Sequence, residues 1–193
     1  MEKAREYLFD KTRPVGAYSS VHYDKSTRFD KAKEQANLIT CSTQKIIDYT
    51  NEFLQLLGMQ PVLSPKVERQ LFNTDLYTAI KDLNGLKDKR DIVWMKFTTD
   101  GFLGAVATSD DINFQMPNDL SDYNKKTAED KWRYNTSGII IHHLKKKWDE
   151  SFALVFPLQN IPTGLKRGDI ERGIGNYLIK NKVPILDFFS HRY

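Results

Sequence analysis

The strongest constraint on the fold of this chain is a hairpin signal at Asp100-Gly101. The pair separates two apolar runs, residues 92–99 and 102–109. An Asp-Gly pair suits a two-residue β-turn because both central positions of that turn need a positive φ. The sequence therefore predicts two antiparallel strands joined at this point.

A two-residue turn also fixes which residues face each other across the hairpin. The register pairs Phe97 with Gly104, Met95 with Val106 and Trp94 with Ala107. One face then carries Val93, Met95, Phe97 and Val106, and the other carries Ile92, Trp94, Lys96 and Ala107. Because both faces are largely apolar, the hairpin is predicted to lie inside a sheet and not at its edge.

Helical patterns dominate the residues before this hairpin. A short helix is predicted over residues 2–9. Apolar residues at three- and four-residue steps predict a long amphipathic helix over 28–57, and Gly58 is placed to end it. Cys41 lies within this predicted helix and is interpreted as an inert thiol. Ser64-Pro65 resembles the start of a second helix, which would end at Asn84-Gly85.

Strand and helix patterns alternate after the hairpin. Strands are predicted over 138–145, 151–158 and 183–189, and a helix over 168–180. Between the hairpins lies a long polar segment, residues 110–135, with a short helix near 127–134. The chain is therefore predicted to be α+β, with an N-terminal helical pair packed on a mixed, mainly antiparallel sheet of about five strands and one C-terminal helix.

The length of 193 residues favours a single domain over residues 1–193, with a helical half of about 1–88 and a sheet half of about 89–193. No apolar run approaches the roughly 18 residues of a membrane-spanning helix. The first residues lack the apolar core of a secretory signal. These features predict a cytoplasmic protein with no membrane partner.

Positive charge is concentrated at the end of the chain. Residues 124–193 hold 13 basic and 7 acidic residues, a net charge of +6, whereas residues 1–123 hold 16 basic and 18 acidic residues, a net charge of −2. Such asymmetry attracts polyanions. Aromatic residues among the bases are also typical of surfaces that stack nucleic-acid bases.

This pattern predicts a nucleic-acid- or polyanion-binding protein with a basic and aromatic C-terminal surface. The predicted contacts are Lys125, Lys126, Lys131, Trp132, Arg133, Lys145, Lys146, Lys147, Lys166 and Arg167. The segment 163–168 is the preferred single locus for a phosphate or carboxylate, because backbone N–H groups and two cations converge at the start of a predicted helix.

Two other functions remain open. His142 and His143 lie beside a lysine cluster, and one of them could act as a general acid or base in a phosphodiesterase or nuclease. Alternatively, the chain could be a protein-interaction or inhibitory factor, because the same aromatic and basic residues are common in protein interfaces. The sequence leaves open whether the chain is an enzyme. It predicts no cofactor and no metal site.

Overall fold

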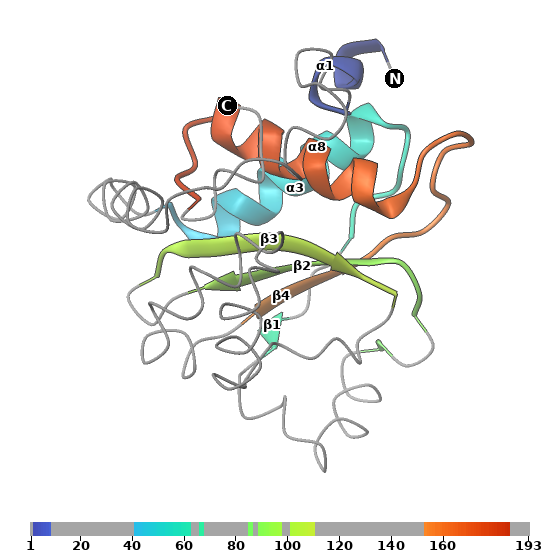
Figure 1. Ribbon diagram of the computed structural model, residues 1–193. Helices are drawn as coiled ribbons and strands as arrows, with labels where there is room; N and C mark the ends of the chain where they lie inside the picture. Colours follow the sequence, from blue (N-terminus) through green and yellow to red (C-terminus); the bar gives the residue numbers. More distant parts are fainter. Residues whose placement is uncertain are drawn as a thin grey trace, which may run out of the picture.

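A computed structural model of the chain describes residues 2–8, 41–62, 66–67, 85–86, 89–97, 101–110 and 153–185, the pair 66–67 through its backbone alone. These residues form an α+β structure in which helices cover one face of an antiparallel sheet (Figure 1). The predicted fold class is confirmed at this level.

The sheet has four antiparallel strands among the described residues, in the spatial order β1-β4-β2-β3. They are β1 (Lys66–Val67), β2 (Ile92–Phe97), β3 (Leu103–Ser109) and β4 (Ala153–Pro157). Three of them have five residues or more and β1 has two, so the described sheet is smaller than the five strands predicted. β2 and β4 lie in its interior.

The hairpin of β2 and β3 confirms most of the predicted register. Met95 faces Val106 and Trp94 faces Ala107. Beyond Lys96 the pairing shifts by one residue, so Phe97 faces Leu103 instead of Gly104. Glycine suits this β-bulge because it has no side chain to pack against a neighbour.

The start of the second predicted helix is wrong. Lys66 and Val67 were assigned to that helix, but they form β1 and pair with Leu154 and Ala153 of β4. The signal at Ser64-Pro65 is purely local, whereas pairing with β4 satisfies the backbone through residues far along the chain. The remainder of that helix falls on residues that the structure does not describe, apart from Gly85, whose φ is +61°.

Helix α3 (Thr43–Leu56) is the described part of the long predicted helix. Ser42 caps its first turn: its backbone is extended, and its hydroxyl oxygen accepts from the N–H of Lys45 at 3.3 Å. The helix therefore begins at Thr43, and Cys41 lies half-buried before it and not within it. Gly58 follows the helix with φ +78°, as predicted.

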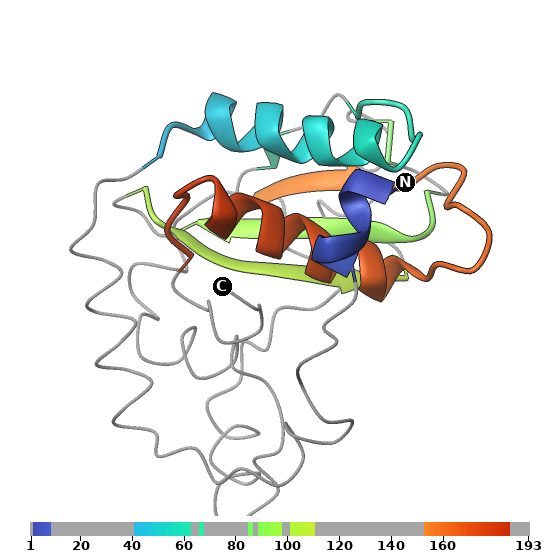
Figure 2. The ribbon, with the colours of Figure 1, turned by 90° about the horizontal axis from the view of Figure 1, so that it is seen from above.

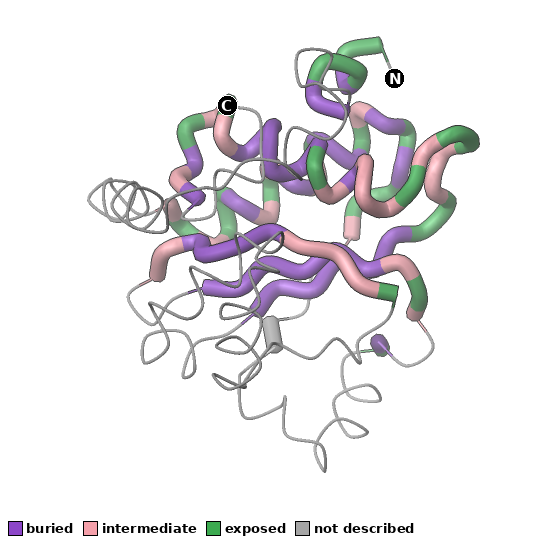
Figure 3. Tube along the Cα trace, in the orientation of Figure 1, coloured by how far each residue is buried: buried purple, intermediate pink, exposed green. Residues whose placement is uncertain are grey.

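Helix α8 (Arg167–Lys180) confirms the predicted C-terminal helix, and the first residues form a 3-10 turn (Glu2–Ala4) followed by α1 (Arg5–Leu8). Seen from above, α3 and α8 lie over the same face of the sheet, and α1 lies over α8 (Figure 2). The inner sides of this helical layer are buried (Figure 3).

Gly173 allows the closest approach within the helical layer. A Cβ at this position would lie 2.4 Å from Cζ of Phe53 in α3 and 3.1 Å from Cδ2 of Leu8 in α1. The 2.4 Å distance to the Phe53 ring is sterically forbidden and the 3.1 Å distance to Leu8 is tight, so the bare backbone of α8 is part of the contact.

The core lies between the helices and the sheet and combines residues of both halves of the sequence, such as Phe53, Met95, Phe156 and Ile174. The opposite face of the sheet is buried as well. It carries Lys96, which is 2% exposed. The prediction that the hairpin lies inside the sheet is confirmed for β2, whereas β3 is the last strand in the order among the described residues.

Several predicted elements fall on residues outside the described ranges: the helix near 127–134, the strand over 138–145 and most of the second helix. The last predicted strand is described up to Ile185, which forms an isolated parallel bridge with Leu103, the first residue of β3. The single domain over residues 1–193 stays a prediction. None of the described helices is long and apolar enough to cross a membrane.

We predict that Gly173→Ala lowers the free energy of unfolding by about 1–3 kcal/mol, because the new methyl group must displace the Phe53 ring. The matched control is Gly168→Ala in the same helix, where an added Cβ meets no atom within 4 Å. Urea denaturation measures both variants. Equal stabilities of the two variants would contradict the close approach.

Candidate functional site

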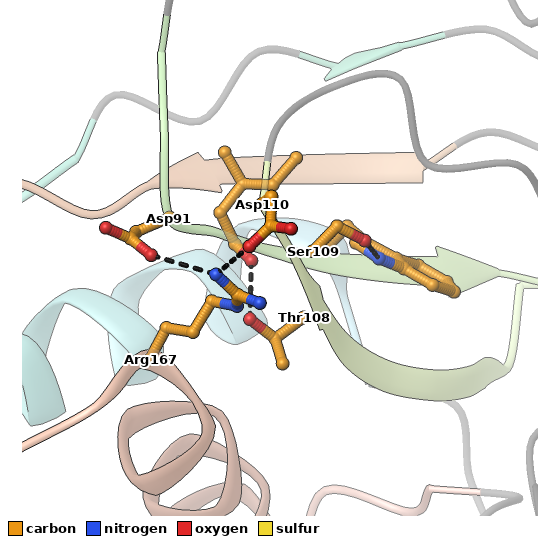
Figure 4. Close-up of polar contacts among 7 residues, drawn as sticks. Asp91, Thr108, Ser109, Asp110 and Arg167 are labelled. Carbon is orange, nitrogen blue, oxygen red and sulfur yellow. Dashed lines mark hydrogen bonds and ion pairs between the residues drawn. The ribbon is translucent and has the colours of Figure 1, made fainter.

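The start of α8 brings charged residues from three parts of the chain together. Arg167 is the first residue of the helix, Asp91 precedes β2 and Asp110 follows β3. The guanidinium Nη1 of Arg167 donates to Oδ1 of Asp91 at 3.1 Å and also contacts Oδ1 of Asp110 (Figure 4). One cation thus joins two carboxylates at the end of the sheet.

The backbone of Asp91 explains how the carboxylates are positioned. Its φ is +52°, an uncommon conformation that Asp tolerates better than most residues. Its N–H donates to the carbonyl oxygen of Asp110 at 2.8 Å, and its own carbonyl oxygen accepts from the N–H of Leu158 at 2.8 Å. Asp91 therefore ties the ends of β2, β3 and β4 to one another.

The hairpin register explains why a cation is favourable here. Because Ile92 faces Ser109, the next pair outward is Asp91 and Asp110. Like charges opposite each other across a strand pair are destabilising. The guanidinium of Arg167 removes this repulsion. We name these three residues the Arg167 cluster.

The cluster lies at the surface. The side chain of Arg167 is 33% exposed, that of Asp91 44% and that of Asp110 77%. Ion pairs this exposed contribute at most about 1 kcal/mol each. The hydrogen bond that Arg167 donates to Asp91 is the main cause that raises its pKa. Desolvation opposes this effect, and the contact with Asp110 adds to it.

Two neighbouring hydrogen bonds hold the ends of the strands. The hydroxyl of Thr108 donates to the carbonyl oxygen of Ile92 at 2.8 Å, and the indole N–H of Trp94 donates to the hydroxyl oxygen of Ser109 at 3.0 Å (Figure 4). These bonds join β2 to β3 next to the two carboxylates.

Lys166 precedes Arg167 at the cap position of α8. Its side chain is exposed, and its backbone N–H donates to Oδ2 of Asp169 at 2.9 Å. Cations are unfavourable at the positive end of a helix dipole. Three carboxylates of the chain itself, those of Asp91, Asp110 and Asp169, offset this charge.

The segment 163–168 was predicted to attract a carboxylate or phosphate. Carboxylates do gather at the start of α8, but they are those of the protein. Of the predicted contacts, the structure places Lys166 and Arg167 side by side at this point. The described residues hold no group of three metal-ligating side chains.

The other predicted site residues lie outside the described part of the chain. They are His142 and His143 of the proposed catalytic pair, and the contacts Lys125, Lys126, Lys131, Trp132, Arg133, Lys145, Lys146 and Lys147. These assignments stay predictions.

A second cluster of titratable groups lies in the helical layer. The ring of Tyr177 contacts those of Tyr7, Phe53 and Tyr49 at centroid distances of 5.0, 5.6 and 6.4 Å. Burial, followed by a hydrogen bond with Glu52, raises the pKa of Tyr177 to about 12. The phenol is thus held in its neutral form and joins α8 to α3.

Comparisons of the chain with protein-family models, with curated proteins and with solved structures found no match. The function must therefore be argued from the chemistry of the chain itself.

We predict that the raised pKa of Tyr177 makes the folded state sensitive to high pH. The neutral phenol contributes fully to the free energy of unfolding below pH 10, the ordinary pKa of tyrosine. This contribution is lost as the pH rises through about 12, the pKa of Tyr177 in the folded state. Between these limits the stability advantage of the wild type over Tyr177→Phe should shrink by roughly 2–3 kcal/mol. Urea denaturation at pH 9 to 12 measures this difference, and a constant difference would refute the shift.

Proposed function

We propose that the chain binds nucleic acid or another polyanion through its C-terminal third. The observation that supports this proposal is the charge distribution: the last 70 residues carry a net charge of +6, and the 123 residues before them carry −2. A field of this polarity steers polyanions toward one part of a molecule and supplies most of the affinity of non-specific nucleic-acid binding.

The described residues contribute one part of the proposed surface. Residues 158–185 contain five basic and two acidic residues, and this excess includes the exposed Lys166. Arg167 shares its charge with two carboxylates, so among the described residues we assign the leading contact to Lys166. The lysines and aromatic residues between positions 124 and 148 are predicted to form the rest of this surface.

The location of Lys166 favours this role. Lys166 is exposed beside the first turn of α8, and the N-terminus of a helix attracts anions. The carboxylates of Asp91 and Asp110 contact Arg167, so the charge of Lys166 is the one that a phosphate at this place would meet. A cytoplasmic location, where nucleic acids are abundant, belongs to the same proposal.

The two other functions stay as predictions. The nuclease hypothesis depends on His142 or His143, and the protein-interaction hypothesis depends on the helical half and residues 110–135. The two histidines and residues 111–135 lie outside the described ranges. No observation in the described ranges favours either function over polyanion binding.

We predict that the affinity for a fluorescent double-stranded DNA falls steeply with salt, with a log–log slope of about −0.9 for each phosphate contact. Replacing Lys166 by Gln should reduce the magnitude of this slope by about one. Fluorescence anisotropy over a series of salt concentrations measures both quantities.

Lys45→Gln is the matched control, because Lys45 is an exposed lysine on α3 in the N-terminal half and its loss changes the net charge equally. It should leave the slope unchanged. Binding that is indifferent to salt, or an absence of binding to single- and double-stranded probes at low salt, would refute the proposal. Equal effects of the two substitutions would show that only net charge matters and not the position of Lys166.

A further inference from the structure

A second pair of basic residues, Lys89 and Arg90, lies next to the Arg167 cluster. The pair directly precedes Asp91, whose carboxylate accepts from Arg167 at 3.1 Å (Figure 4). Consecutive Cα atoms are about 3.8 Å apart, so the backbone of Lys89 is at most two such steps from Asp91. Lys166 is one step from Arg167. The ion pair therefore brings two basic pairs together, although 76 residues separate its own partners along the chain.

Backbone hydrogen bonds hold the chain on both sides of this second pair. The N–H of Lys89 donates to the carbonyl oxygen of Leu86 at 3.2 Å, and Leu86 is buried. On the other side, Asp91 is bonded through its N–H to Asp110 and through its carbonyl oxygen to Leu158, each at 2.8 Å. The fold thus sets the position of the basic pair at the end of the sheet.

The pair lies at the surface and adds positive charge to it. Arg90 is exposed and Lys89 is half-buried. A lysine whose stem is partly covered keeps its ammonium group in water. The Arg167 cluster itself has a net charge of −1, because one guanidinium contacts two carboxylates. Lys89, Arg90 and Lys166 add three positive charges beside it, so these six residues together carry +2.

The charge distribution along the sequence does not reveal this arrangement. The second basic pair belongs to the first 123 residues, whose net charge is −2. In the structure it shares the end of the sheet with Lys166, the leading contact of the proposed surface, because Asp91 and Arg167 are bonded. Proximity in the fold, and not position in the chain, decides which cations an extended anion can reach.

We propose that Lys89 and Arg90 are part of the polyanion-binding surface, and that they and Lys166 contact successive phosphates of one bound nucleic acid. This inference rests on the proposed function and deepens it with two contacts from outside the C-terminal third. A chain of phosphates can engage both basic pairs at once, because a DNA duplex carries one charge for about every 1.7 Å of its axis. Contacts to phosphate carry no sequence information, so duplexes of different sequence should bind with the same affinity.

The test measures how the affinity of the full chain for a fluorescein-labelled DNA duplex of about 12 base pairs depends on salt, by fluorescence anisotropy. Arg90 has a contact of its own within the chain, so Lys89→Gln is the cleaner substitution. Lys89→Gln should reduce the magnitude of the log–log slope by about one. The double variant with Lys166→Gln should reduce it by about two, because each lost phosphate contact counts separately.

Three further variants separate a phosphate contact from other effects. Lys45→Gln on α3 removes the same charge and should leave the slope unchanged. Lys89→Arg keeps the charge and should restore the wild-type slope. Arg90→Gln should act as Lys89→Gln does, and it decides the test if Lys89→Gln has lost the helical circular dichroism of the wild type.

The outcomes distinguish this inference from the proposed function. If the wild type binds and Lys166→Gln lowers the slope, but Lys89→Gln and Arg90→Gln leave it unchanged, the inference is overturned and polyanion binding stands. A double variant that loses no more slope than Lys166→Gln, or an equal loss in Lys45→Gln and Lys89→Gln, overturns the inference as well. A wild type that does not bind the duplex at low salt overturns both.

Discussion

The close approach of α8 to α3 and α1 at Gly173 is the constraint on which the rest of the structure depends. Phe53 and Leu8 occupy the space that any side chain at this position would need. This contact fixes how α8 lies over the sheet, and so it places Arg167 at one end of the helix beside Asp91 and Asp110. It also brings Asn176, three residues further on, against the N-terminal segment.

Elements with a strong local or periodic signal were predictable from the sequence. The Asp100-Gly101 pair predicted the hairpin and most of its register, and the strand predicted over 151–158 is present as β4. Errors arose where a distant contact decided the outcome. Lys66 and Val67 follow a good helix-start signal, yet they pair with β4. The bulge at Gly104 and the cap at Ser42 are local, but an apolar pattern alone does not show them.

The candidate site likewise has a part that could be predicted from the sequence and a part that could not. Asp91 and Asp110 follow directly from the hairpin register, which places them opposite each other and implies a nearby cation. The identity of that cation could not be derived, because Arg167 is 76 residues from Asp91 and reaches it only through the packing of α8. The sequence identified Arg167 and Lys166 as charges available to an external anion, whereas the structure gives Arg167 two carboxylate partners within the chain.

A double-mutant cycle between Gly173 and Phe53 tests the central constraint most directly. Phe53→Leu removes the ring atoms nearest to Gly173 and leaves a space that the methyl group of Gly173→Ala can enter. Free energies of unfolding should therefore show a favourable coupling of about 1 kcal/mol or more, with the double variant more stable than the sum of the single effects implies. Additive effects would show that the two positions are not in contact and would contradict the account.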